Sequence, residues 1–182
     1  MLPTLTQPAA GPVTDSGPDV VDAYLGGLAA ALDGLSRAAV WDAVDLLLAT
    51  ASAGRRIYLV GNGGSAATAS HMANDLNKQA SVPGAPLFRA IALTDNVPLI
   101  TAWSNDEDYA AAFAMQLANH VETAREAGAA VIALTGDTGG ALRGLVDVCL
   151  CVPSPLIGHQ EDVHLVLNHV ITTDIRSRLG AA

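Results

Sequence analysis

Four polar residues in two distant segments have types and spacings that suit chemistry. His71 and Asp75 are four residues apart in an Ala-rich segment, so they lie on one face of the helix expected there. Glu161 and His169 lie near the C-terminus and share a face of a second expected helix. Apolar residues surround His169, and a buried imidazole needs a polar partner. Two imidazoles and two carboxylates form a ligand set that Zn²⁺ accepts. The alternative is that they are ordinary polar residues of two helices.

A glycine-rich turn precedes His71. Residues 56–76 read RIYLVGNGGSAATASHMANDL, in which 57–60 is typical of a buried strand and 61–65 is a turn into the helix. Backbone N–H groups and the positive end of a helix dipole meet at such a turn, which suits a phosphate or another anion. The sequence is neither a Walker motif nor a GxGxxG motif. A purely structural turn is therefore the competing interpretation.

Composition restricts the class of protein. The chain has 182 residues, a net charge of −9 and only nine Lys plus Arg, so we expect no nucleic-acid binding. No apolar run approaches the roughly 20 residues that span a bilayer, and the N-terminus does not resemble a signal peptide. Cys149 and Cys151 are interpreted as core thiols on opposite faces of a strand. We therefore expect a cytoplasmic protein without a membrane partner. Residues 1–16 are expected to be a flexible lead-in, and 17–182 a single domain.

Helical and strand-like patterns alternate along the chain. Helices are predicted at 19–35, 38–52, 97–103, 106–127, 142–146 and 160–179, and strands at 57–60, 88–94, 130–134 and 148–152. Each strand is an unbroken apolar run, which is typical of a parallel sheet covered on both faces. The first two helices have broad apolar faces and are expected to form an antiparallel pair. The predicted fold class is α/β.

Four segments together resemble the sugar isomerase (SIS) domain family. These are GNGGSAATASHMANDL, LTDNVPLITAWSND, VIALTGDTGGAL and VPS…EDVHLVLNH, which occur in the family's order. They are most similar to its phosphoheptose isomerases, which interconvert sedoheptulose 7-phosphate and a D-glycero-heptopyranose 7-phosphate. The resemblance implies a three-layer α/β/α sandwich with a parallel, flavodoxin-like sheet. It also implies a homotetramer with active sites at subunit interfaces.

The resemblance assigns site residues by position. It implies that Asn62, Gly63 and Ser65 bind the sugar phosphate, with Asp95 nearby. The expected reaction is an aldose–ketose isomerisation through an enediol. Two alternatives are a non-catalytic SIS protein that binds the replication initiator and a module that senses a sugar phosphate.

The metal and acid/base positions of the family also have counterparts here. His71, Asp75, Glu161 and His169 match its zinc ligands, and Asp75 with His169 matches its acid/base pair. Glu161 is also counted among the substrate-binding residues. The family usually has Glu at the position of Asp75 and Gln at the position of Glu161. The added negative charge favours a divalent cation and disfavours an anionic sugar phosphate.

One family element is missing between His120 and the strand predicted at 130–134. The family has a further strand and a Ser-rich loop of the form SGNS there, and that loop holds much of the substrate phosphate. Either the protein lacks this unit, or the 182-residue chain is an incomplete form of it. Loss of a strand from a parallel sheet usually leaves an unfilled core, so the sequence favours the incomplete form.

Overall fold

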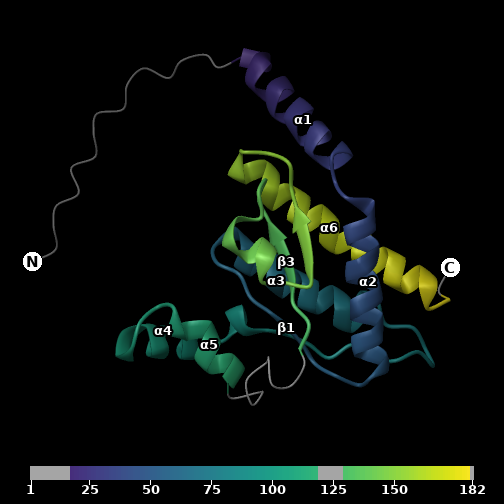
Figure 1. The fold of residues 1–182 in the computed structure, drawn as a ribbon, viewed down its shortest axis with the longest axis vertical. Coiled ribbons are helices and arrows are strands. Elements are labelled where there is room, and N and C mark those ends of the chain that lie inside the picture. The colour runs from purple at the N-terminus through teal and green to yellow at the C-terminus, as the bar shows by residue number, and fades with distance from the viewer. Residues whose placement is uncertain (1–16, 119–128, 181–182) are drawn as a thin grey trace, which may run out of the picture.

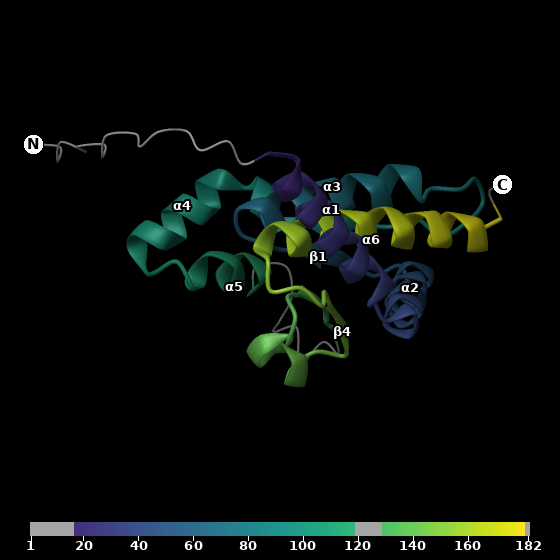
Figure 2. The ribbon, with the colours of Figure 1, turned by 90° about the horizontal axis from the view of Figure 1, so that it is seen from above.

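The computed structural model describes residues 17–118 and 129–180 (Figures 1 and 2). The elements in chain order are α1 (Gly17–Asp33), α2 (Arg37–Ser52), β1 (Ile57–Leu59), α3 (Gly64–Asn74), η1 (Asp75–Gln79), β2 (Ala90–Ala92), η2 (Leu93–Asp95), α4 (Val97–Asp106), α5 (Ala111–Ala118), β3 (Ile132–Thr135), η3 (Gly140–Gly144), β4 (Val148–Cys151) and α6 (Ile157–Arg178). Among these residues, no helix has the length and apolar character that a bilayer span requires.

All strand pairing in the described residues is parallel, which confirms the predicted α/β class. β1 pairs with β2, and β3 pairs with β4. Each of the two sheets has two strands, and β1 is not hydrogen-bonded to β3. In the part of the chain that the structure describes, no strand lies between α5 and β3. Within the described residues, the two strand pairs thus form two separate two-stranded sheets.

The core lies where α2, α3 and α6 meet the strands. α6 crosses the molecule beside α3 and α2, as both views show. The largest fully buried apolar side chains are Val44, Leu76, Val152, Val163, Leu167, Ile171 and Ile175. Burial of one such side chain contributes roughly 1.5–3 kcal/mol. The contacts that stabilise this core are thus also the contacts that fix α3 against α6.

The predicted N-terminal helix pair is present as α1 and α2. The Ser36 side chain accepts a hydrogen bond from the Ala39 backbone N–H at 3.2 Å, which caps the start of α2. α2 ends before Gly54, whose φ of +66° is a left-handed conformation that favours glycine. α1 packs on the first part of α6.

Three predictions about elements need correction. The single helix predicted at 106–127 is wrong at its start, because α4 continues to Asp106 and α5 begins afresh at Ala111. The Asp108 side chain accepts from the Ala111 N–H at 3.0 Å and caps the new helix. Residues 119–128 of the predicted helix, which include His120, lie outside the described residues. The helix predicted at 142–146 is a 3₁₀ turn, η3.

The third correction concerns the two cysteines. Side chains two positions apart on a strand point to the same face, so the placement on opposite faces was wrong. Cys149 and Cys151 lie side by side on β4, with their sulfurs 3.5 Å apart. Leu150 between them points into the core and is 2% exposed.

Candidate active site

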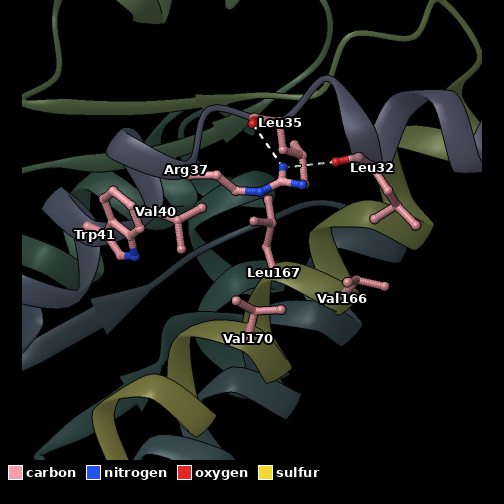
Figure 3. Close-up of a pocket in the computed structure, with 8 residues that line it drawn as sticks. All are labelled: Leu32, Leu35, Arg37, Val40, Trp41, Val166, Leu167 and Val170. Atoms are coloured by element: carbon pink, nitrogen blue, oxygen red, sulfur yellow. Dashed lines mark hydrogen bonds between the residues drawn. The ribbon is translucent and has the colours of Figure 1, made fainter. Parts of the chain in front are cut away.

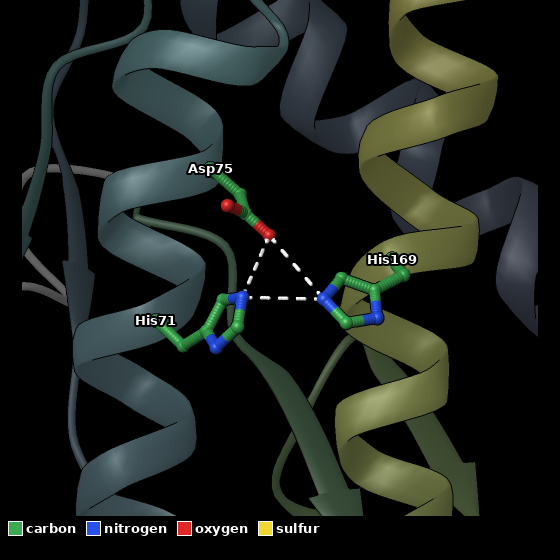
Figure 4. Close-up of side chains that lie close together, drawn as sticks. All are labelled: His71, Asp75 and His169. Carbon is green, nitrogen blue, oxygen red and sulfur yellow. Dashed lines mark hydrogen bonds and ion pairs between the residues drawn. The ribbon is translucent and has the colours of Figure 1, made fainter.

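His71, Asp75 and His169 converge at the contact between α3 and α6 (Figure 4). The His71 and His169 Nε2 atoms are 3.2 Å apart. Asp75 Oδ2 lies 3.3 Å from His71 Nε2 and 3.8 Å from His169 Nε2. His71 and Asp75 meet because they are one helical turn apart, and His169 reaches them from α6. The structure thus brings together three of the four residues predicted as metal ligands.

The carboxylate is buried, whereas both imidazoles are open to solvent. The Asp75 side chain is 5% exposed, against 43% for His71 and 49% for His169. Asp75 also begins η1, a π-helical turn that continues α3. π-turns inside helices are rare and frequent at functional sites. A ligand would therefore approach from the imidazole side and meet Asp75 at the base of the cluster.

Asn168 is a site residue that the sequence interpretation missed. Its Nδ2 donates to Asp75 Oδ2 at 2.9 Å, and the Asn168 side chain is fully buried. Asn74 Nδ2 donates to the other oxygen, Asp75 Oδ1, at 3.1 Å. Both carboxylate oxygens therefore accept an amide hydrogen bond, which fixes the orientation of the carboxylate. The signal that could have identified Asn168 was an amide side chain within the apolar run LVLNH.

The three converging atoms fit a small divalent cation. A tetrahedral ion with ligand distances of about 2.0–2.1 Å separates neighbouring ligand atoms by roughly 3.3–3.4 Å. The three separations in this cluster are 3.2, 3.3 and 3.8 Å. Two imidazole nitrogens and one carboxylate oxygen are also the donor set of many catalytic zinc sites. The residues present therefore fit a metal such as Zn²⁺.

Glu161, the fourth predicted ligand, lies elsewhere within this chain. A Cβ built on Gly64 would come within 2.6 Å of the Glu161 carboxyl carbon, so the carboxylate packs directly on this glycine. Gly64 is the first residue of α3. The positive end of the α3 dipole thus faces a carboxylate. The roles of Glu161 in metal and substrate binding stay predictions.

The residues predicted to bind phosphate form the turn between β1 and α3. Gly63 has a φ of +56°, and the Ser65 N–H donates to the Asn62 carbonyl at 3.0 Å. The hydroxyl of Tyr109, which follows the end of α4, donates to Asn62 Oδ1 at 2.6 Å. Asp95 instead accepts a hydrogen bond from the Ser70 hydroxyl, on the second turn of α3.

Two further histidines on α6 are buried. His164 Nε2 lies 3.3 Å from the Thr135 carbonyl, and burial lowers the pKa of His164, against smaller opposing effects of that carbonyl and of Glu161. His159 Nδ1 lies 3.0 Å from the Ser154 hydroxyl, and its ring packs edge-on against Tyr24. His159 is thus a packed core residue.

Comparison with known proteins agrees with this geometry. The profile of the SIS domain family matches residues 24–121. The chain is 35% identical over 159 residues to a phosphoheptose isomerase of Mycobacterium tuberculosis, covering 75% of this chain and 81% of that protein. It is also 35% identical over 161 residues to the lincomycin biosynthesis protein LmbN of Streptomyces lincolnensis, covering 69% of this chain. That match spans only 58% of LmbN.

Solved structures show the same relationship. The phosphoheptose isomerase of Neisseria gonorrhoeae matches with a TM-score of 0.77 and 27% identity, covering 87% of this chain and 98% of that one. The enzyme of Francisella tularensis also gives a TM-score of 0.77, at 28% identity. The chain therefore belongs to the SIS domain family, and within it to the phosphoheptose isomerases, which are isomerase enzymes.

Proposed function

We propose that the chain interconverts sedoheptulose 7-phosphate and a D-glycero-heptose 7-phosphate through an enediol. The observation that carries the proposal is the convergence of His71, Asp75 and His169 at the contact of α3 with α6. The relatives that are named phosphoheptose isomerase supply the substrate class. The catalytic unit would be one SIS domain over residues 17–182.

Asp75 and His169 are the proposed acid/base pair. An aldose–ketose isomerisation removes a proton from the carbon next to the carbonyl and moves protons between two oxygens. Asp75 is oriented by amide donors on both oxygens, and His169 is half exposed, so each can face a sugar from a different side. His71 Nε2, 3.2 Å from His169 Nε2, orients the second imidazole.

A divalent cation would be held by His71, Asp75 and His169, and Glu161 remains a proposed fourth ligand. When bound, such an ion polarises substrate oxygens and lowers the cost of the enediolate. His169 Nε2 cannot hold a cation and a proton at the same time. Removal of the metal with a chelator therefore distinguishes a mechanism that needs the cation from one in which His169 acts as an acid or base without it. Activity is lost only if the cation is required in turnover.

The turn 61–65 is the proposed phosphate end of the site. Asn62, Gly63 and Ser65 lie at the N-terminus of α3, where backbone N–H groups favour an anion. Asp95, at the end of η2, accepts a hydrogen bond from Ser70, which lies five residues after Ser65 in α3. The phosphate and the sugar carbonyl would thus lie at opposite ends of the exposed face of α3.

We further propose a homotetramer with active sites at subunit interfaces. An apolar groove between the α1–α2 corner and α6 includes Trp41, which is 56% exposed, together with Val166 and Val170 (Figure 3). Val166 and Val170 also line a second groove that contains His169. Exposed apolar surface of this kind marks an interaction site. It is continuous with the catalytic cluster, so a second subunit placed there would border the site.

Sedimentation tests this assembly. Trp41→Glu is expected to dissociate the oligomer, whereas Leu145→Glu, at another strongly exposed apolar position, is expected to leave it unchanged. Equal sedimentation of the two variants would contradict the proposed interface. We expect the reaction to occur in the cytoplasm, where free thiols such as Cys149 and Cys151 stay reduced.

The isomerase itself is tested by incubating the purified chain with sedoheptulose 7-phosphate in D₂O. We expect an aldose phosphate that carries carbon-bound deuterium, because the enediol exchanges its proton with solvent. Asp75→Asn and His169→Ala should each lower kcat by about 10²–10⁴-fold. Asp106→Asn, an exposed carboxylate on α4, serves as the control. Binding of the ketose phosphate without turnover would favour the sensor, and neither binding nor turnover would favour the initiator-binding protein.

A further inference from the structure

The strand pair β3–β4 carries a second cluster of ligand atoms, on the face opposite Leu150. Cys149 and Cys151 come from β4, and Thr135 comes from the end of β3, where it is in register with Cys151. All three side chains are half-buried, so the cluster reaches solvent. The cluster contains none of the residues assigned to isomerisation.

The three atoms form a nearly equilateral triangle. The Cys149 and Cys151 sulfurs are 3.5 Å apart, and the Thr135 hydroxyl oxygen is 3.5 Å from each of them. A tetrahedral ion with bonds of about 2.3 Å to sulfur and 2.0–2.2 Å to oxygen separates two sulfurs by roughly 3.8 Å and a sulfur from an oxygen by roughly 3.6 Å. The triangle therefore matches one face of a tetrahedral coordination shell to within a few tenths of an ångström.

A disulfide suits the same positions less well. Residues two apart on a strand have Cα atoms about 6.6 Å apart, which is at the upper end of the range for disulfides. Their Cα–Cβ bonds are parallel and do not converge. A disulfide would thus require the backbone of β4 to distort. A cation between the sulfurs requires no such movement, because the sulfurs already lie at the separation that it needs.

The loop after β3 keeps space open beside the cluster. Gly139 has a φ of +76°, and a Cβ at this position would come within 2.9 Å of Arg143 Cβ and within 3.2 Å of the Cys151 sulfur. That separation is tight for carbon and sulfur. A glycine at Gly139 thus serves both the left-handed turn and the room around the thiol.

We propose that Cys149, Cys151 and Thr135 bind a thiophilic divalent cation such as Zn²⁺. The cation takes the place of two thiol protons, which pass to solvent, while the Thr135 hydroxyl keeps its proton and contributes a neutral oxygen. The two thiolates then balance the charge of the cation, and the fourth position is open to water. Because Thr135 belongs to β3, the ion would join two strands that form a sheet on their own, and such small sheets are only marginally stable.

Titration of the reduced, metal-free full chain with Cd²⁺ tests the proposal, with a phosphine as reductant. Thiolate-to-Cd²⁺ charge transfer absorbs in the ultraviolet and reports sulfur ligands alone. We expect one ion per chain with this absorbance, two protons released per ion, and competition by Zn²⁺. Cys149→Ser and Cys151→Ser should each weaken Cd²⁺ binding by at least about a hundredfold. Thr135→Val should weaken it by a smaller factor.

The controls separate this site from the catalytic cluster. His169→Ala is expected to remove one Cd²⁺ equivalent that gives no sulfur absorbance and to leave the thiolate band intact. An absent band, a band that survives in both serine variants, or one ion shared by two chains would each overturn the proposal. Because the readout does not depend on turnover, the result is independent of whether the chain isomerises a heptose phosphate.

Discussion

Replacement of Asn168 by Leu tests whether this buried amide positions the Asp75 carboxylate. Asn168 Nδ2 donates to Asp75 Oδ2 at 2.9 Å, and leucine has a similar volume but no donor. A hydrogen bond to a charged group contributes about 1.5–3 kcal/mol. If that orientation is needed only in the transition state, its loss lowers kcat by about 10- to 150-fold, at 1.36 kcal/mol for each factor of ten.

The free energy of unfolding should change much less than the activation free energy. Asn168 Oδ1 is buried without a hydrogen-bond partner, and an unpaired buried acceptor costs about 1–3 kcal/mol. Leucine removes this penalty while it leaves Asp75 without one donor, so the two effects on stability oppose each other. The assay is kcat for the ketose phosphate, measured alongside urea unfolding followed by circular dichroism.

Thr172→Val provides the matched control for this experiment. Thr172 is also fully buried on α6, and its hydroxyl donates to the Asn168 backbone carbonyl at 2.9 Å without an interaction with Asp75. It should lower the free energy of unfolding by about 1 kcal/mol and leave kcat unchanged. Wild-type kcat in Asn168→Leu would refute the positioning role, as would a loss of activity that merely follows a loss of folded protein.

Three further predictions concern the anion end of the site and the core of α6. Glu161→Gln should lower KM for the sugar phosphate severalfold, because a negative charge leaves the N-terminus of α3; an unchanged KM would contradict it. Gly64→Ala should likewise lower KM, because its Cβ would push the flexible end of the Glu161 side chain away from the N-terminus of α3, whereas Gly26→Ala meets no atom within 4 Å and should be neutral in the same assay. Burial lowers the pKa of His164 in the folded chain, so the unfolded chain binds more protons just below about pH 6.5 and the free energy of unfolding should fall as the pH falls through that window. His164→Gln should flatten this dependence in urea titrations, and an unaltered slope would exclude His164 as its source.

Local periodicity was enough to predict most of the fold. The helices and strands carry one apolar face or an unbroken apolar run, and these patterns depend on near neighbours in the sequence. The break between α4 and α5 was missed because Tyr109 continued an apolar helical stripe, whereas its hydroxyl bonds Asn62 across the turn before α3. Asp108, the residue that caps α5, was the signal that could have located this break.

The site could be predicted only in part, for a geometric reason. His71 and Asp75 are one helical turn apart, so the sequence alone places them together. Eight residues separate Glu161 from His169, which corresponds to a rise of about 12 Å along α6. A shared helix face therefore does not bring these two side chains to one point, and in the structure Glu161 packs on Gly64. The contact of Asn168 with Asp75 depends on how α6 packs against α3, which no local pattern encodes.

The cluster of His71, Asp75 and His169 does not depend on how the described strands pair. These residues lie on α3, η1 and α6, which are fixed by buried residues such as Leu76 and Leu167 rather than by strand pairing. The absence of hydrogen bonding between β1 and β3 therefore does not disturb the positions of His71, Asp75 and His169. The turn 61–65, by contrast, faces the Glu161 carboxylate. We therefore expect weak phosphate binding, which raises KM, whereas kcat depends on His71, Asp75 and His169.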